Sequence, residues 1–345
     1  MRILLIGAHG FIGNAVTERL REKHSLIGVS RHPQGSCHEE IEADLTKEEP
    51  SFPEDIDVAF YLIHSMREKK GDFYELEERA AKHFVSAIKK TQCKQIIYVS
   101  GLCHGLPTSK HMQSRHNVER ILKDSGVPLT IFRSGIILGE GSGSFEIMRD
   151  LVEKLPVMIC PRWVKSLSQP IYINDVLYYL EHALSNPLCF KRTFEIGGPE
   201  QLSYKKMLEI MGEVRGLKRH LITIPLLTPN LSSYWLVFIS SASFLLAKNL
   251  IESLYQDAIC SEHTIHTVIP HTCMGYRETL EQIFAHPKLT HGCYRSKLEN
   301  TLSFTYKKSR YGEWWVDKNT LIFRPKGLLG RLLYPLLRRY IQCCD

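Results

Sequence analysis

The sequence predicts an α/β protein built on a doubly wound parallel sheet. Short apolar runs rich in Ile, Val, Tyr and Leu alternate with amphipathic stretches through the first 135 residues. The runs recur about every 25 to 35 residues, the spacing of right-handed strand–helix–strand crossovers. A glycine-rich turn follows the first run directly, where a strand gives way to a helix.

The individual elements follow from these local patterns. The expected strands are Ile3 to Ile6, Leu26 to Val29, Val58 to Leu62, Gln95 to Val99 and Leu129 to Phe132, with a short further strand just before Asp44. The expected helices are Phe11 to Lys23, Phe73 to Thr91 and Lys110 to Asp124, whose apolar positions fall three and four residues apart. Such helices bury one face against the sheet and turn their charges to water.

The pattern changes after Gly139, and this change divides the chain. A loop of glycines and serines leads into a helix near Phe145 to Lys154, and short strands and helices follow at 171 to 215. We therefore predict a Rossmann-type domain at 1–140 and a smaller α+β region, on the substrate side over the carboxyl ends of the strands, at 141–285. Residues 286–345 form a basic tail.

The composition fits a folded protein. Of 345 residues, 43% are hydrophobic and 23% charged, which excludes a disordered chain, a collagen and a small disulfide scaffold. The excess of 44 basic over 37 acidic residues belongs to the tail, because residues 286–345 hold 12 basic and 4 acidic residues. Within it, residues 326–339 mix leucines with four basic side chains, which suits either a peripheral contact with an anionic membrane or a shortened terminal helix. Nucleic acid is a lesser candidate partner, since no RNA- or DNA-binding motif surrounds the basic stretch.

The cysteines and the N-terminus bear on location. The ten cysteines show no C-x-x-C spacing, which predicts reduced thiols and no metal site. Met1 leads directly into the first strand without the features of a signal peptide, so we expect a cytoplasmic protein, peripheral at the inner membrane if the tail binds lipid. Residues 221–247 carry no charge, but two prolines and several serines interrupt them, which favours a buried or surface-docked helix over a membrane span.

The turn Gly7-Ala8-His9-Gly10-Phe11-Ile12-Gly13 predicts a dinucleotide site. Gly7 permits the tight turn, Gly10 lets the backbone approach a pyrophosphate, and Gly13 lets helix and strand pack closely. The N-terminus of the helix then offers unpaired N–H groups to the anion. The residues expected to line the cofactor are Gly7, His9, Gly10, Phe11, Ile12 and Gly13.

The end of the second strand bears on the choice between NADP(H) and NAD(H). An NAD-specific site places an acidic residue there to bind the ribose 2′-hydroxyl. This sequence has Ser30-Arg31-His32 instead, and Arg31 can hydrogen-bond a 2′-phosphate, so NADP(H) is preferred and NAD(H) is the alternative. Asp44 and Leu45, after the third strand, are placed to meet the adenine, although Asp44 could equally cap a helix at Thr46.

Together these features resemble the short-chain dehydrogenase/reductase superfamily, in its extended and atypical branch. The residues that carry the resemblance are the glycine turn, Asp44-Leu45, Tyr98-Val99-Ser100-Gly101, and Arg133-Ser134-Gly135 with Gly139. A second set is similar to a bacterial group of NAD(P)-binding, nucleoside-diphosphate-sugar-epimerase-like proteins: Tyr61 to Met66, Ser144 to Glu146, Leu155 to Met158, Pro161 to Val164, Gln169 to Ile171, Phe194 to Pro199 and Leu231 to Trp235. That group usually continues into a C-terminal domain of unknown function, and the resemblance implies that residues 286–345 are its shortened remnant.

Carbonyl-reducing members of that superfamily use a Tyr-x-x-x-Lys pair on the helix after the fifth strand. Here that helix holds no tyrosine, and the nearest frame is His111-x-x-x-Arg115, one helical turn apart. An imidazole with the ordinary pKa of about 6.5 can exchange a proton near neutral pH, and a guanidinium can hold a ribose or a phosphate. Because Ser100 stands where the superfamily places its substrate-orienting serine, the resemblance implies a catalytic set of Ser100, His111 and Arg115. A solvated helix start is the alternative for His111 and Arg115.

Two further pairs of residues are weaker candidates. His64 and Ser65 end the fourth strand, where the resemblance implies that the backbone passes the adenosine ribose, although a polar turn would look the same. Arg162 and Trp163 fall in a region that closes over the substrate in epimerase-like relatives. The arginine could fix an anionic group, and the tryptophan could offer an apolar face.

The predicted function is an NADP(H)-binding oxidoreductase or epimerase-like enzyme acting on an unknown small molecule. The uncharged stretch 221–247 and the leucine-rich tail favour a lipophilic substrate, while a sugar nucleotide stays open. The missing tyrosine favours the alternative, a catalytically silent NADP(H)-binding sensor or assembly factor, including one that is peripheral to a membrane.

Overall fold

The computed structural model describes residues 1–63, 73–103, 109–160, 162–223 and 256–285, and the strands at 305–309, 312–317 and 320–325. The chain divides into two compact units, Met1–His286 and Pro287–Asp345. The second unit contains a three-stranded antiparallel sheet of β14 (Thr305–Ser309), β15 (Gly312–Asp317) and β16 (Thr320–Pro325). The uncharged stretch from residue 224 onward and the leucine-rich segment 326–339 lie outside the described residues.

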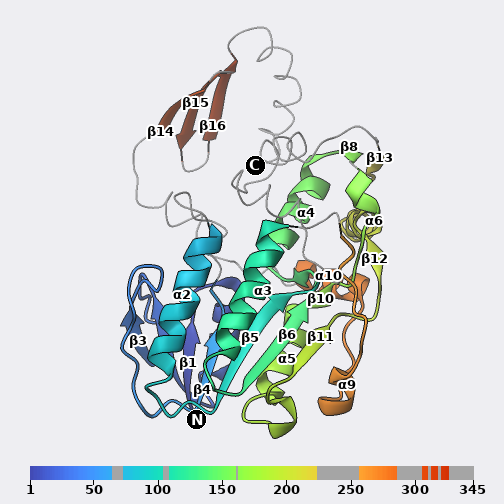
Figure 1. Cartoon of the computed structure of the whole chain (residues 1–345). Coiled ribbons are helices and arrows are strands. Elements are labelled where there is room, and N and C mark those ends of the chain that lie inside the picture. The colour runs from blue at the N-terminus through green and yellow to red at the C-terminus, as the bar shows by residue number, and fades with distance from the viewer. Residues whose placement is uncertain are drawn as a thin grey trace. The chain divides into compact units, whose positions relative to one another are not determined.

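The first unit is built on a seven-stranded sheet in which every neighbouring pair is parallel. Its strands are β1 (Arg2–Ile6), β2 (Ser25–Ser30), β3 (Glu39–Glu42), β4 (Val58–Tyr61), β5 (Gln95–Gly101), β6 (Leu129–Ser134) and β11 (Thr193–Ile196). Their order, β11-β6-β5-β4-β1-β2-β3, reverses the direction of winding between β1 and β4 (Figure 1). The predicted doubly wound parallel sheet is therefore confirmed.

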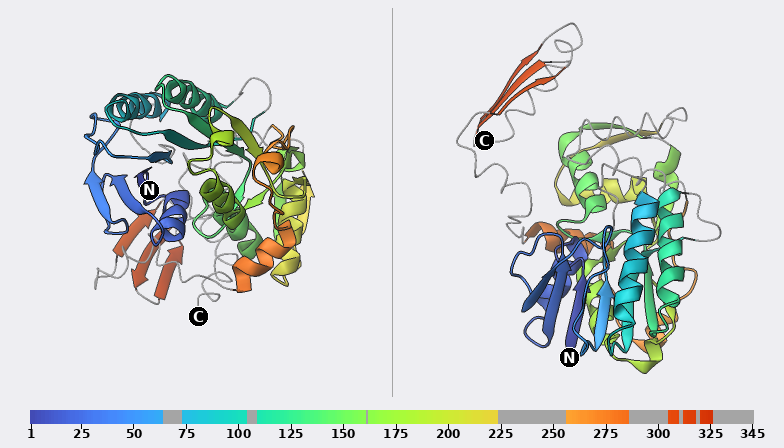
Figure 2. Two further views of the ribbon diagram at one scale, coloured as in Figure 1. Left: turned by 90° about the horizontal axis from the view of Figure 1, so that it is seen from below. Right: turned by 60° about the vertical axis from the view of Figure 1, so that its left-hand side comes forward.

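Helices cover both faces of the sheet, as the views in Figure 2 show. The four helices are α1 (Phe11–Leu20), α2 (Phe73–Ile88), α3 (Lys110–Lys123) and α5 (Ile173–His182). Side chains alternate along each strand, so Leu4 and Ile6 join the core under α2 and α3, whereas Ile3 and Leu5 join the core under α1 and α5. Burial on both faces explains why the strands are nearly continuous apolar runs.

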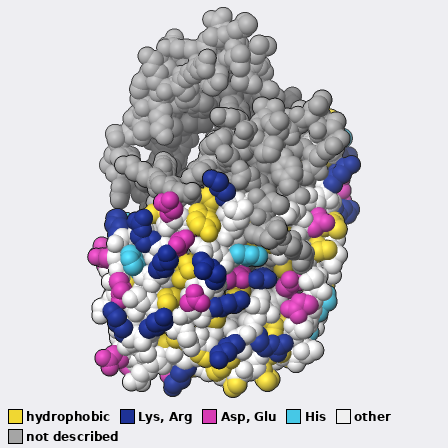
Figure 3. Space-filling model, viewed as in Figure 1, with side chains coloured by type: hydrophobic (Ala, Val, Ile, Leu, Met, Phe, Trp, Pro, Cys, Tyr) yellow, Lys and Arg dark blue, Asp and Glu magenta, His cyan; other side chains and the backbone are white. Residues whose placement is uncertain are grey.

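The outer surface of α2 and α3 is polar. Figure 3 shows basic and acidic side chains interspersed on this face of the molecule. Ion pairs on and next to α2 join Lys82 to Glu78 at 2.5 Å and Lys90 to Glu49 at 2.5 Å. Exposed pairs of this kind add little stability.

A smaller region follows β6. Its elements are β7 (Ile137–Leu138), α4 (Gly143–Lys154), β8 (Val157–Cys160), η1 (Arg162–Lys165), β9 (Leu167–Ser168), β10 (Ile171–Tyr172), η2 (Pro187–Cys189), β12 (Leu202–Ser203), α6 (Tyr204–Val214), β13 (His220–Thr223), α9 (Ile265–Val268) and α10 (Tyr276–Ala285). A separate core around Phe145, Val152, Met207 and Leu280 joins α4, α6 and α10. Among the described helices, none is long and apolar enough to cross a membrane.

Two details differ from the sequence prediction. Thr193–Ile196 was expected within the smaller region, yet it joins the main sheet as β11 beside β6. It forms the edge of the sheet, and only alternate residues of the four are buried, so the run lacks the continuous apolar pattern by which the inner strands were predicted. After β3, the chain forms a hydrogen-bonded turn at residues 45–47 rather than a helix starting at Thr46.

Candidate cofactor-binding and catalytic site

The glycine turn lies at the point where the winding of the sheet reverses. It joins β1 to α1, and β1 is flanked by β2 on one side and β4 on the other. In open parallel sheets ligands bind in the crevice outside the carboxyl ends of the strands at such a reversal. The tertiary structure therefore places Gly7, Gly10 and Gly13 where a nucleotide would enter.

Each glycine of the turn meets a different steric demand. Gly7 has φ +88°, a left-handed conformation, and a Cβ there would lie 2.8 Å from Ile63 Cγ2. At Gly13 a Cβ would lie 2.2 Å from the Gly7 carbonyl oxygen and 2.8 Å from the Ala8 carbonyl, so only glycine lets α1 approach the turn. At Gly10 the nearest atom to a Cβ would be the Gly7 oxygen at 3.3 Å, which leaves Gly10 exposed on its outer side.

The N-terminus of α1 is open toward this crevice. Gly10 is its N-cap, and no side chain caps it among the described residues. The Gly10 amide donates to the Gly7 carbonyl at 3.0 Å, and the Asn14 amide donates to the Gly10 carbonyl at 2.8 Å, so the turn is held by its own backbone. The first N–H groups of α1 have no partner within the helix, which suits an anion.

Phe11 and Ile12 hold the start of α1 in place through apolar packing contacts. The Phe11 ring packs against the loop after β7, because a Cβ at Gly139 would lie 2.9 Å from Phe11 Cζ. Ile12 packs against the core under α1 and α5. The Phe11 contact therefore fixes the helix tip relative to the loop after β7, and the Ile12 contact fixes it relative to the core of the main sheet.

Beside the turn lies a polar contact that sequence reasoning missed. His9 Nδ1 is 3.3 Å from Ser36 Oγ, and His9 Nε2 is 3.7 Å from Glu40 Oε1. The Glu40 carboxylate also accepts backbone N–H groups from Gln34 at 2.6 Å and Ser36 at 2.8 Å. Burial opposes the ionisation of Glu40, but these backbone hydrogen bonds outweigh it and lower the pKa of the carboxyl group. A carboxylate from β3 thus holds the loop after β2 against the glycine turn.

The predicted adenosine-side residues follow β2 and β3. Arg31 is exposed directly after β2, where the sequence placed it. Asp44 Oδ1 accepts from the Thr46 hydroxyl at 2.6 Å and from the Thr46 amide at 3.1 Å, and Asp44 Oδ2 pairs with Lys47 at 3.1 Å. The carbonyl oxygen of the buried Leu45 lies within hydrogen-bond distance of His83 Nδ1, at 2.8 Å. The Asp44 carboxylate therefore serves the local turn, and contact with adenine at Asp44-Leu45 stays a prediction.

Ser100, His111 and Arg115 gather at the carboxyl end of β5. Arg115 Nε donates to His111 Nε2 at 2.9 Å, and Arg115 Nη1 donates to the Val99 carbonyl at 3.3 Å, next to Ser100. Helix α3 can come this close because a Cβ at Gly101 would meet Met112 and Arg115. The Ser100 hydroxyl is buried and makes no hydrogen bond of good geometry to a described residue.

Burial changes the acid–base chemistry expected of His111. The side chain is only 7% exposed. Desolvation, reinforced by the charge of Arg115, lowers the pKa of His111 to about 3. The expectation that this imidazole exchanges protons near neutral pH is therefore corrected: it is neutral, and its Nε2 is an acceptor for Arg115. The alternative of a solvated helix start is also wrong, because both side chains are buried.

Arg115 is a buried cation without an acidic partner among the described residues. Its side chain is 9% exposed, and its hydrogen-bond acceptors are an imidazole nitrogen and a backbone carbonyl, both neutral. By contrast, the guanidinium of Arg133 on β6 pairs with Glu119 at 2.5 Å. A buried charge is costly unless it is compensated, so Arg115 is suited to an anionic ligand group.

Other predicted site residues cannot be placed in this way. His64 and Ser65 lie outside the described residues. The backbone at Arg162 and Trp163 belongs to η1, but their side chains are outside the described part of the chain. Their roles in binding cofactor or substrate stay predictions.

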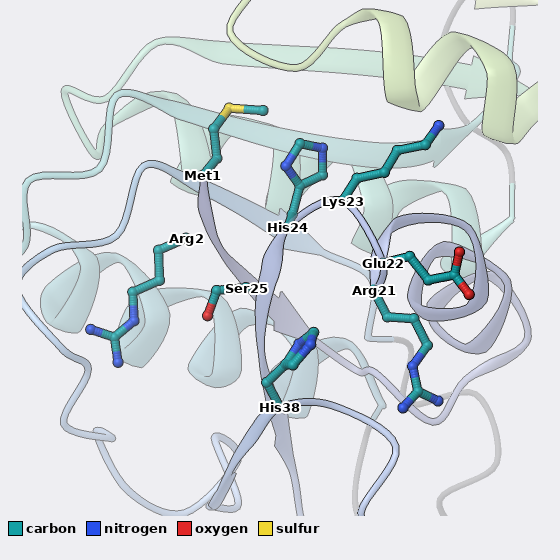
Figure 4. Close-up of a pocket in the computed structure, with 8 residues that line it drawn as sticks. All are labelled: Met1, Arg2, Arg21, Glu22, Lys23, His24, Ser25 and His38. Atoms are coloured by element: carbon teal, nitrogen blue, oxygen red, sulfur yellow. The ribbon is translucent and has the colours of Figure 1, made fainter.

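A surface hollow elsewhere on the first unit is not the nucleotide site. Figure 4 shows its lining residues, Met1, Arg2, Arg21, Glu22, Lys23, His24, Ser25 and His38. They precede or begin β1, β2 and β3 or follow α1, so the hollow lies at the amino ends of these strands, away from the glycine turn. Its Arg2 guanidinium is already paired with Asp55 at 2.5 Å and with Glu39 at 2.7 Å.

Comparisons with known proteins agree with this geometry. Residues 7–158, which include the glycine turn, α2 and α3, match a family described as NAD(P)H-binding. Among solved structures, UDP-glucuronic acid 4-epimerase from Bacillus cereus, in complex with UDP-glucuronic acid and NAD, is similar with a TM-score of 0.62 at 17% identity, over 84% of this chain and 99% of that chain. The chain has an NAD(P)-binding, epimerase/dehydratase-like fold.

Two further structures share the NAD(P)-binding fold. A nucleoside-diphosphate-sugar epimerase from Staphylococcus aureus has a TM-score of 0.61 at 15% identity, over 81% of this chain and 100% of that chain. MoeE5 in complex with UDP-glucose and NAD has a TM-score of 0.63 at 16% identity, over 84% of this chain and 100% of that chain. No curated protein matches the chain. The predicted NAD(P)-binding domain and its fold are thereby confirmed.

Proposed function

We propose that the protein is an NADP(H)-dependent oxidoreductase or epimerase-like enzyme that acts on a small anionic molecule. The observation that carries this proposal is the glycine turn at the reversal of the sheet, with the uncapped tip of α1 beside it. NADP(H) is proposed over NAD(H) because Arg31, and not an acidic residue, follows β2. NAD(H) is the alternative, since NAD is bound in two of the similar structures and the Glu40 carboxylate lies near the turn.

The substrate class follows from Arg115 and Ser100. A buried guanidinium with neutral acceptors favours a ligand that carries a phosphate or a carboxylate, and a buried hydroxyl beside it can orient the reacting oxygen. A sugar nucleotide has both kinds of group, and UDP-sugars are bound in two of the similar structures. A lipophilic anion is the other candidate, and its support is the sequence at 221–247 and in the tail.

The chemistry that a nicotinamide would supply is hydride transfer. In this chain His111 accepts a hydrogen bond from Arg115, which positions the guanidinium at the end of β5. Because burial keeps the imidazole neutral, His111 is a positioning residue and not the proton donor. Arg115 and Ser100 are left to bind and orient the substrate.

The second candidate is a catalytically silent NADP(H)-binding sensor or assembly factor. The specific observation in its favour is that α3 contains no tyrosine and that burial lowers the pKa of His111, which stands in the position of the family's tyrosine, to about 3. Peripheral membrane contact through residues 326–339 belongs with this candidate and rests on the sequence alone.

Nucleotide titration tests the cofactor assignment. We expect NADPH to bind, and Arg31→Ala to weaken NADPH at least tenfold while NADH changes little, because only NADPH carries the 2′-phosphate. Arg21→Ala is the matched control, since Arg21 is an exposed arginine in the hollow at the other end of the strands. Equal weakening of both nucleotides by Arg31→Ala would contradict the NADP(H) preference.

A substrate screen separates the enzyme from the sensor. Oxidation of NADPH that depends on an added sugar nucleotide or other anionic carbonyl compound supports the enzyme. Arg115→Met should then raise KM more than it lowers kcat, whereas Ser100→Ala should lower kcat. Tight NADPH binding without turnover across phosphorylated and carboxylated carbonyl compounds would favour the sensor.

A further inference from the structure

We propose that Asp175, His271 and Cys273 form a binding site for a divalent transition-metal ion, with zinc as the best match. Their ligand atoms, one from each residue, all lie within 4.8 Å of one another. Asp175 is in the first turn of α5, and His271 and Cys273 lie in the segment between α9 and α10. The proposal is independent of the nucleotide site and uses none of its residues.

The three donors are the kinds that zinc accepts. Carboxylate oxygen, imidazole nitrogen and thiolate sulfur bind Zn²⁺ at about 2.0 to 2.3 Å, so donor atoms in a tetrahedral site are roughly 3.3 to 3.6 Å apart. Asp175 Oδ1 and His271 Nε2 are 2.7 Å apart in the metal-free arrangement, where they form an ion pair or hydrogen bond. A small rotation of either side chain opens this contact to the spacing that an ion needs.

His271 and Cys273 are suited to act together because one residue separates them. In an extended segment, side chains two residues apart point to the same side. Residues 270–274 carry no helix or strand assignment, and the pair faces Asp175 on the neighbouring helix. The sequence suggested no metal site, since it contains no C-x-x-C and the third donor lies 96 residues before His271.

Each of the three donors is also held by a neighbouring group. The Met274 amide donates to Asp175 Oδ2 at 3.0 Å, which leaves Oδ1 toward His271. The Tyr178 ring stacks on the His271 ring with centroids 4.0 Å apart and an interplanar angle of 15°. The Tyr179 hydroxyl lies 3.4 Å from Cys273 Sγ. Metal sites characteristically orient their ligands through such outer contacts.

The site is shielded but reachable. The Asp175 side chain is 9% exposed, the His271 side chain is 21% exposed, and Cys273 is half-buried. An ion can therefore enter from the His271 side. Three protein ligands leave one coordination position for water or for a further group, as in zinc sites that are not closed.

A plain ion pair that fastens the loop to α5 would explain Asp175 and His271. It would not explain why a thiol lies within 4.8 Å of both ligand atoms, in contact with a tyrosine hydroxyl. A bound ion uses all three groups at once and would tie the segment before α10 to α5. The structural consequence is a metal-dependent rise in the stability of the first unit.

Zinc titration of the full chain against a chromophoric chelator tests the proposal. We expect about one equivalent bound per chain. Loss of a group that only orients a ligand typically weakens metal binding about 10- to 100-fold. Loss of a ligand itself should weaken it at least as much, so we expect Cys273→Ser and His271→Gln each to weaken zinc binding at least tenfold. The matched controls are His266→Gln, on the adjacent helix α9, and Cys189→Ser, a buried thiol in η2. Both controls should bind zinc as the wild type does.

Cobalt substitution gives a second readout. Co²⁺ bound to Cys273 should show a thiolate-to-metal charge-transfer band in the wild type and in the control variants, and the band should be absent in Cys273→Ser. If the wild-type protein shows no such band, the assignment is overturned, whatever the variants show. Zinc binding that survives both Cys273→Ser and His271→Gln, with circular dichroism showing both variants folded, would overturn it as well.

Discussion

Replacing Gly10 and Gly13 one at a time separates two predicted functions of the glycine turn, which are binding of the pyrophosphate and close packing of α1. Gly10 has φ −75° and ψ 170°, which an alanine adopts, and a Cβ there would meet one oxygen at 3.3 Å. As an N-cap, alanine is somewhat worse than glycine, so Gly10→Ala should cost less than about 1 kcal/mol of stability. The new methyl group would stand where the backbone must approach the pyrophosphate.

The expected loss of affinity in Gly10→Ala follows from the hydrogen bonds involved. A hydrogen bond to a charged group contributes about 1.5–3 kcal/mol, and 1.4 kcal/mol corresponds to a tenfold change in Kd. Losing even one backbone N–H to phosphate contact should therefore weaken NADPH and NADH roughly 10- to 100-fold. Both nucleotides should weaken equally, because both carry the pyrophosphate.

Gly13→Ala should behave in the opposite way. Its Cβ would lie 2.2 Å from the Gly7 oxygen and 2.8 Å from the Ala8 carbonyl carbon, and these backbone atoms cannot rotate away. Overpacking costs about 1–3 kcal/mol or more, offset by about 1 kcal/mol from better helix propensity. Because the contacted atoms are backbone, we take the upper end of that range and expect a net loss of about 2 kcal/mol, seen as a fall of about 4–8 °C in Tm.

The assay is thermal unfolding together with fluorescence titration of each variant with NADPH and NADH. Gly10→Ala should melt close to the wild type and bind poorly. Gly13→Ala should melt early whatever its affinity. Unchanged nucleotide affinity in Gly10→Ala would refute the assignment of this turn as the pyrophosphate cradle, and an unchanged Tm in Gly13→Ala would refute the packing argument.

The remaining predictions concern Glu40, His111 and Ser100. Because the folded pKa of Glu40 is lowered, its contribution is present above the unfolded pKa of about 4.3 and lost as pH falls through the folded value. In denaturant unfolding, the stability gap between wild type and Glu40→Gln should therefore shrink below about pH 4. The folded pKa of His111 is about 3 against about 6.5 unfolded, so protonation favours the unfolded chain and this residue lowers stability as pH falls from 6.5 toward 3. In NMR titration the His111 ring should show no protonation between pH 5 and 8, and a midpoint near 6.5 would contradict its burial. Ser100→Ala should change Tm little, because the hydroxyl makes no hydrogen bond of good geometry to a described residue; a fall of several degrees would contradict this.

Much of the fold was predictable because its signals are local. The apolar runs that begin at Ile3, Val58 and Leu129 each form a strand of the parallel sheet, and the helices predicted from Phe11, Phe73 and Lys110 begin at those residues. The glycine turn is equally local, since all its steric contacts except those of Gly7 with Leu62 and Ile63 lie within seven residues. Spacing along the chain also fixed the contact of His111 with Arg115, one helical turn apart.

Tertiary packing decided the rest of the site. Whether His111 is charged depends on the elements that bury it, and spacing along a helix carries no information about that burial. Glu40 reaches His9 because β3 lies beside β2, and Asp175 meets His271 and Cys273 because α5 packs against a segment nearly a hundred residues later. The amino-acid sequence by itself determined the first strands, the helices between them and the glycine turn, since each depends on neighbouring residues, whereas only the tertiary structure showed that β11 joins the sheet. The chemistry of the buried and long-range groups was decided only on folding, because pKa and coordination depend on distance and dielectric in space.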